Sequence, residues 1–243
     1  MNQKRPDAIK YLTGHLCTRD YPSGISLPGQ GGKFNTSGEV QTWRGNTFLC
    51  HVVRSSPSFS ALVELQEQIK RSEFGRLITF LPAPSFHMTV FQGLSPGKQG
   101  KDDWPAGLPE DVHRDHATAE MLNRVQNVQL ASNYEIRVAD LFCASSLTVE
   151  GRDDAAEATL RQARELLRET TRISPPDFDT YVFNISLGYL IQWLSESTAR
   201  ELVEFSDSLF GTFESRLQSI ELEPCAFCNF ENMHAFFPVK KFT

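Results

Sequence analysis

The chain has 243 residues, a length that suits one large domain or two small ones and can bury a full hydrophobic core. It carries 24 Lys and Arg against 30 Asp and Glu, a net charge of −6, which argues against a protein that coats DNA by neutralising its phosphates. Hydrophobic residues make up 40% of the chain and Phe occurs 18 times, so the composition excludes a disordered protein.

Three features bear on location. The longest apolar stretch, residues 181–194, contains polar residues and is shorter than the roughly 20 residues of a membrane helix. The first residues are charged and no apolar core follows them, unlike a signal peptide. Five Cys, an odd number in a long chain, fit reduced thiols. We therefore expect a cytoplasmic protein with no membrane partner, and the sequence leaves its oligomeric state open.

The pattern of apolar residues and turn formers predicts an order of elements along the chain. Residues 1–45 are rich in Gly and turn formers and predict an irregular arm that packs on one domain spanning residues 46–243. Periodicity predicts strands at 47–53, 77–94 (broken by Pro82 and Pro84), 134–138, 147–149, 183–191, 219–230 and 235–239. Capping residues and apolar stripes predict helices that begin after Ser56, span 116–126 and 153–171, and run from Ser195 to Gly211, with a surface excursion at 95–115.

Helices and strands are mixed in this order, and several strands can pair antiparallel, so the fold class is α+β. Two similar units of strand, helix and strand suggest a pseudo-symmetric pair of lobes. A cleft between two lobes is the natural place for a site.

The strand at residues 86–91 carries one candidate site. Alternation places Phe86, Met88 and Val90 on one face and His87 and Thr89 on the other. The imidazole and the hydroxyl then stand about 6.6 Å apart along the strand, a spacing at which both can contact oxygens of one phosphate. The alternative is a core histidine that donates to a backbone carbonyl.

The strand at residues 183–187 repeats this arrangement. Phe183, Ile185 and Leu187 share one face, and Asn184 and Ser186 share the other. A polar group on a buried strand face costs free energy unless it is paired, and a bound anion would pair both dyads. His116-Ala117-Thr118 has the same spacing as His87 and Thr89 but lies in a helix-like segment. The spacing alone is therefore weak evidence for a site, and the prediction depends on the two dyads lying on apolar strands.

With these paired dyads the chain resembles the 2H phosphoesterase superfamily, the LigT-like fold of RNA 2′,3′-cyclic phosphodiesterases and 2′-5′ RNA ligases. The resemblance covers roughly residues 46–243 and implies a two-lobed, pseudo-symmetric fold with antiparallel sheets and outer helices. The segments Gly32-Lys33-Phe34-Asn35 and Trp43-Arg44-Gly45-Asn46-Thr47 look like an uncharacterised bacterial and fungal branch of that superfamily.

The resemblance also implies roles for the dyads. In the family one His is the general base, the other His is the general acid, and the Thr or Ser hydroxyls hold phosphoryl oxygens. His87 is then a catalytic His, Thr89 is its hydroxyl partner and Ser186 is the second hydroxyl. The expected mechanism needs no metal and no cofactor.

Asn184 departs from the family pattern because it stands where the second His belongs. An amide donates hydrogen bonds to phosphate but cannot exchange a proton at neutral pH. Losing a general acid or base costs about 10² to 10⁴ in rate, so another group would have to replace it. His51, Tyr189 and His234 are the candidates, and Tyr189 is also a candidate substrate-binding residue.

Further binding residues are expected in the arm. Lys33 and Arg44 could clamp a phosphate and Trp43 could stack on a base, because Arg binds phosphate bidentately and aromatic rings stack on nucleobases. The alternative is that these residues anchor the arm to the domain.

Other motifs are rejected. Cys225 and Cys228 with His234 imitate part of a zinc site, but strand positions three apart face opposite sides and a second Cys pair is missing. The run Gly29 to Lys33 lacks the full phosphate-loop pattern. His113 and His116, beside Asp111 and Asp115, fit a solvated turn better than a metal site.

Three functions remain open. The first is a phosphoesterase that acts on a cyclic phosphate of a small nucleotide or of an RNA end. The second is a module that binds such phosphates without turnover because Asn184 replaces the second His. The third is a structural or interaction protein, which would show neither binding nor turnover.

Overall fold

The computed structural model describes residues 5–97 and 102–242. Its centre is a seven-stranded sheet in the order β11-β10-β3-β5-β8-β7-β6. Every pairing within this sheet is antiparallel, which confirms the predicted α+β class. The strands are β3 (Gly45–His51), β5 (His87–Gln92), β6 (Ile136–Phe142), β7 (Ser146–Gly151), β8 (Asn184–Ser186), β10 (Ala226–Asn232) and β11 (Ala235–Lys241).

The sheet has two halves that repeat one order of elements. In one half α2 lies in sequence between β3 and β5, and in the other α4 lies between β7 and β8. The halves join where β5 pairs with β8, with Met88 opposite Ile185. This junction is the middle of the predicted pseudo-symmetric, two-lobed arrangement.

Two helices begin where the predicted caps Ser56 and Ser195 place them, whereas the helix predicted at 116–126 spans Arg114–Arg124, because His113 caps it. Ser56 Oγ accepts from the Phe59 amide at 3.1 Å, and Asp153 and Ser195 cap their helices in the same way. The last long helix passes through Gly211 and ends at Phe213, so the predicted end is wrong: a glycine weakens a helix without stopping it, and Phe213 is buried. The helices are α1 (Ala8–Leu12), α2 (Pro57–Arg71), α3 (Arg114–Arg124), α4 (Asp154–Thr171) and α5 (Glu196–Phe213), with 3₁₀ turns at Gly75–Leu77, Ala83–Ser85, Phe178–Thr180 and Glu214–Arg216.

The predicted strand at 183–191 is two strands in different sheets. After β8 the chain turns, because the Leu187 and Gly188 amides both donate to the Ser145 carbonyl, at 2.8 and 3.0 Å. It continues as β9 (Gly188–Leu190), which pairs with β4 (Ile78–Phe80) outside the main sheet. Residues 219–222 form two isolated bridges in place of the predicted start of a strand.

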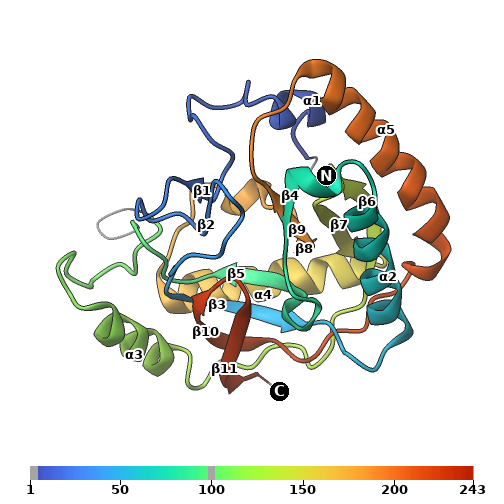
Figure 1. Ribbon diagram of the computed structural model, residues 1–243. Helices are drawn as coiled ribbons and strands as arrows, with labels where there is room; N and C mark the ends of the chain where they lie inside the picture. The colour runs from blue at the N-terminus through green and yellow to red at the C-terminus, as the bar shows by residue number, and fades with distance from the viewer. Residues whose placement is uncertain (1–4, 98–101, 243) are drawn as a thin grey trace.

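Two hydrophobic cores lie on opposite faces of the sheet. The larger core holds the inner faces of the helices, with α4 packed against β5 and β7 and α5 against β6. The smaller core joins Leu49 and Cys228 of the sheet to Ile25 and Phe34 of the N-terminal segment. That segment forms β1 (Ile25–Ser26) and β2 (Phe34–Asn35), drawn in blue in Figure 1, and so it helps to build the face of the sheet away from the helices.

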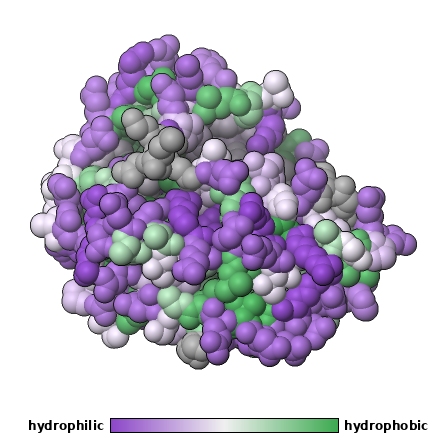
Figure 2. All heavy atoms as spheres, turned by 180° about the vertical axis from the view of Figure 1, so that it is seen from behind, coloured by the Kyte–Doolittle hydropathy of each residue, from purple (hydrophilic) through white to green (hydrophobic). Residues whose placement is uncertain are grey.

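The surface is mostly polar. The face seen from behind is dominated by hydrophilic residues, with hydrophobic residues gathered in its lower half (Figure 2). Across the described ranges no helix is both long and apolar enough to cross a bilayer.

Candidate functional site

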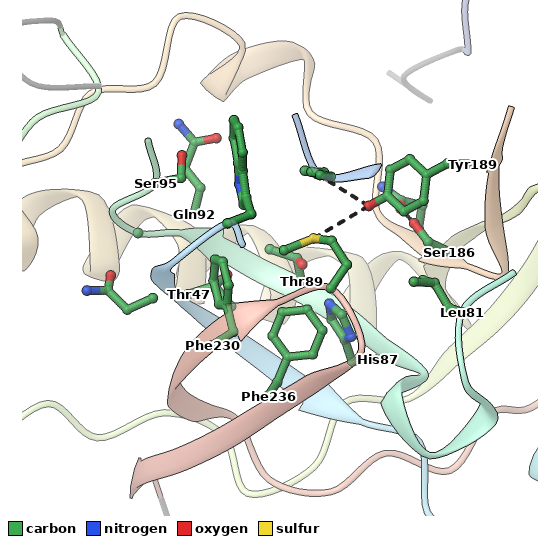
Figure 3. Close-up of a pocket in the computed structure, with 16 residues that line it drawn as sticks. Thr47, Leu81, His87, Thr89, Gln92, Ser95, Ser186, Tyr189, Phe230 and Phe236 are labelled. Atoms are coloured by element: carbon green, nitrogen blue, oxygen red, sulfur yellow. Dashed lines mark hydrogen bonds between the residues drawn. The ribbon is translucent and has the colours of Figure 1, made fainter. Parts of the chain in front are cut away.

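A cavity of about 390 Å³ opens on the face of the sheet that carries the smaller core. Seven predicted site residues line it: His87, Thr89, Asn184, Ser186, Lys33, Trp43 and Tyr189. Apolar walls come from Leu81, Phe230, Met233 and Phe236, and further polar groups come from Asn46, Thr47, Gln92 and Ser95. Figure 3 shows His87 beside Phe236, with Gln92 and Ser95 together at a distance from it.

The register of β5 and β8 brings the two polar dyads together. Met88 lies opposite Ile185 in an antiparallel pair. His87 therefore lies opposite Ser186 and Thr89 opposite Asn184, and all four side chains share the face that Met88 and Ile185 do not use. Alternation alone predicted each dyad, and the pairing of the two strands places both in one cavity.

His87 has a defined tautomer. Its Nδ1 lies 2.7 Å from the Ser85 carbonyl oxygen, and since a carbonyl only accepts, Nδ1 carries the hydrogen. Nε2 of the neutral ring is then the proton acceptor. The Phe236 ring packs at 4.3 Å between centroids and holds the imidazole in place. The hydrogen bond expected of a core histidine is present, and it orients a ring that lines the cavity.

Burial lowers the pKa of His87 from 6.5 to about 4. The hydrogen bond to Ser85 opposes this shift, while the charges of His51 and Lys33 add to it. His87 is therefore neutral at pH 7 and is a proton acceptor in its resting state.

Asn184 and Ser186 are held by local hydrogen bonds. Asn184 Nδ2 donates to the Val182 carbonyl at 3.2 Å, and Ser186 Oγ donates to Asn184 Oδ1 at 3.4 Å. These contacts fix the amide beside the hydroxyl, where both can bind an anion. The amide still cannot transfer a proton, so proton transfer in this half of the site needs another group.

Tyr189 is the one of the three replacement candidates that lines the cavity. Lys33 Nζ donates to its hydroxyl oxygen at 3.3 Å, and the hydroxyl lies 4.0 Å from Met233 Sδ (Figure 3). His51 lies next to His87 on β3, with 6.3 Å between the ring centroids, but does not line the cavity. His234 packs against Phe34, also outside it.

The structure places Arg44 outside the cavity, contrary to our expectation of a phosphate clamp there. Its guanidinium pairs with Glu231 at 2.9 Å, and its carbonyl accepts from Arg114. Trp43, whose amide donates to the Glu231 carbonyl at 2.8 Å, lines the cavity, whereas the Arg44 side chain is 55% exposed to solvent.

Within residues 5–97 and 102–242, no group of three or more His, Cys, Asp or Glu side chains is arranged to hold a metal ion. The two cysteines that imitate part of a zinc site lie on opposite faces of the sheet. Cys225 packs in the larger core and Cys228 packs in the smaller core.

Several cavity residues were not predicted from the sequence. Phe230 and Phe236 lie in predicted strands, and the sequence held no signal that these strands border the cavity. In a regular strand Gln92 would lie on the face opposite to His87 and Thr89, because it is an odd number of residues away from both odd-numbered positions. An irregularity in the pairing of β5 with β3 places Gln92 in the cavity.

The chain is similar to known proteins at two levels. Residues 33–146 match a family model described as 2H-phosphodiest, a domain of unknown function (DUF1868). A crystal structure of a conserved protein of unknown function, ATU0111, from Agrobacterium tumefaciens is 25% identical, with a TM-score of 0.88, over 98% of this chain and 100% of that one. No curated protein matches the sequence.

Two structures of Usb1 from Kluyveromyces marxianus are more distant. One is 10% identical with a TM-score of 0.41, over 82% of this chain and 98% of that one. The other, with uridine monophosphate, is 12% identical with a TM-score of 0.42, over 81% of this chain and 98% of that one. Similarity at this level carries no argument about function.

Proposed function

We propose that the chain, whose residues 33–146 match the 2H-phosphodiest family model, opens the cyclic phosphate of a nucleotide or of an RNA end. The observation that carries the proposal is the meeting of two polar dyads, His87 with Thr89 and Asn184 with Ser186, on adjacent strands that face one cavity.

In the proposed reaction His87 Nε2 takes a proton from a water molecule. The water oxygen forms a bond to phosphorus while one ester oxygen of the ring leaves, so the cyclic diester becomes a monoester. Thr89 and Asn184 donate hydrogen bonds to the phosphoryl oxygens, Ser186 joins them when its hydroxyl hydrogen turns from Asn184 Oδ1 to the phosphate, and Lys33 adds a positive charge. We assign the proton on the leaving oxygen to the Tyr189 hydroxyl. After the ring opens, His87 releases its proton to solvent and Tyr189 takes one from solvent, so both groups return to their resting states.

The test is phosphorus NMR on the four nucleoside 2′,3′-cyclic phosphates with chelator present. Wild type should open the ring, and His87→Ala should lower the rate by about 10² to 10⁴ because the general base is lost. His51→Ala is the matched control, since it removes a neighbouring imidazole that does not line the cavity. Full activity of His87→Ala, or equal losses in both variants, would refute the assignment.

A second function, phosphate binding without turnover, is favoured by Asn184. It predicts that wild type binds the cyclic nucleotides and leaves them intact, and that Asn184→His gains ring-opening activity because a second proton-transfer group returns to β8. Rapid wild-type turnover would exclude this alternative.

A further inference from the structure

Gln92 reaches the cavity through a β-bulge. Leu49 pairs with Thr89 and Phe48 pairs with Phe91, so β5 contains one residue more than β3 between these pairs, and that residue is Val90. In a regular strand residue 92 would face away from His87 and Thr89, because a shift of one residue turns a side chain to the other face. The extra residue turns Gln92 into the cavity.

A buried arginine holds the bulge. A bulged residue is left without its partner in the ladder, and the Val90 carbonyl instead accepts from Arg164 Nη1 at 2.7 Å. Arg164 is 2% exposed, and its guanidinium lies 3.9 Å from the centre of the Tyr181 ring. Tyr181 in turn donates to the Thr89 carbonyl at 3.3 Å. The irregularity is therefore supported from the helix side of the sheet, and Gln92 has a fixed direction.

Two polar residues of β3 near Gln92, Asn46 and Thr47, are occupied by contacts within the fold. Asn46 Oδ1 accepts from the Leu94 amide at 2.8 Å and its Nδ2 donates to Thr118 at 2.9 Å. Thr47 Oγ1 donates to the Phe91 carbonyl at 3.2 Å. The side-chain amide of Gln92 makes no hydrogen bond with any group in the described ranges, although it is half-buried. It presents one acceptor and two donors to the cavity.

The position of Gln92 fits the base of a bound nucleotide. Thr89 pairs with Leu49 and Gln92 pairs with Thr47, so Gln92 stands two residues of β3, about 7 Å, along the sheet from Thr89. This separation is on the scale of the distance between the phosphate and the base of one nucleotide. Trp43 and Phe230 line the same cavity and offer flat apolar faces. The cavity volume of about 390 Å³ suits one nucleotide.

We propose that Gln92 is a specificity-determining residue, which hydrogen-bonds to the edge of the nucleobase while the dyads hold the phosphate. This inference rests on the proposed function for the position of the phosphate. It makes the base of a single terminal nucleotide, as well as its phosphate, part of what the cavity recognises.

Gln92→Glu tests the proposal because it keeps the shape and replaces the two donors by an acceptor. The carboxylate accepts from two adjacent N–H groups, which guanine offers on its pairing edge and uracil does not. Affinities of the four nucleoside 2′,3′-cyclic phosphates are measured by calorimetry in a His87→Ala background, so that any turnover is suppressed. The ratio of guanosine to uridine affinity should rise about tenfold or more.

Gln68→Glu is the matched control, since it makes the same change at an exposed position of α2. Gln92→Ala should bring the four affinities closer together. Unchanged ratios in Gln92→Glu, ratios that change equally in Gln68→Glu, or no binding of any of the four ligands would overturn the inference. Altered ratios without turnover in the wild type would sustain the role of Gln92 and refute the proposed hydrolysis.

Discussion

Acid should destabilise this fold through His87. The unfolded chain takes up a proton on this ring near pH 6.5, whereas the folded chain does so only near pH 4, because burial disfavours the imidazolium. Between these values the unfolded state binds more protons, so the free energy of unfolding falls as the pH falls. The stability is fully present above pH 6.5 and is lost by pH 4.

The size of the effect follows from the difference of the two pKa values. At about 1.4 kcal/mol for each pH unit, the interval from 6.5 to about 4 corresponds to about 3 kcal/mol. His87→Gln removes the titrating group and keeps a side chain that can donate to Ser85. The free energies of unfolding of the two proteins should therefore converge or cross on acidification.

Urea unfolding at half-unit steps from pH 4 to 7.5 measures this difference, because other titrating groups contribute to both proteins and cancel. His51→Gln serves as a comparison, since the pKa of His51 is also lowered by burial. A wild-type minus His87→Gln difference that stays flat over this range would refute the burial argument. If this difference in the free energy of unfolding changed steeply above pH 6.5, the pKa of His87 would be raised by folding and not lowered, which would also refute the argument.

Three further outcomes are expected. Tyr189→Phe should lower the rate of ring opening by about 10² while the affinity for substrate changes little; a normal rate in phosphorus NMR would place the second proton transfer elsewhere. Arg172→Gly should raise the free energy of urea unfolding by about 1 kcal/mol, since Arg172 ends α4 with φ 59° and a glycine avoids that strain; Arg172→Ala is the control, and an equal gain there would contradict the reason. Gln66→Leu should lower the same quantity by about 1 to 3 kcal/mol, because Gln66 Nε2 donates to the buried Leu81 carbonyl at 2.8 Å; unchanged unfolding would show that this carbonyl finds another donor.

Local features of the sequence were sufficient for the starts of three helices and for the dyads. Ser56, Asp153 and Ser195 each cap a helix within their own turn, so the helix starts follow from neighbouring residues alone. His87 and Thr89 share a face because strand side chains alternate, which is also a local property. The predicted resemblance to the 2H phosphoesterase superfamily is supported by the 2H-phosphodiest family model, which matches residues 33–146.

The composition of the cavity depended on contacts between distant segments. Lys33 meets Tyr189 because the N-terminal segment folds over β9, and the sequence of either segment contains no sign of the other. Arg44 was misplaced because the partner that draws it outward, Glu231, lies near the other end of the chain.

The bulge in β5 shows which features follow from the local sequence and which follow from tertiary contacts. Alternation sends residue 92 away from His87, and only the pairing with β3 and the hydrogen bond from Arg164 to Val90 reverse its direction. A strand's own sequence sets the period of its side chains, so the sequence by itself determined which residues form each dyad. The register between strands is set by packing across the sheet, so only the tertiary structure decided that the dyads meet and that Gln92 joins them.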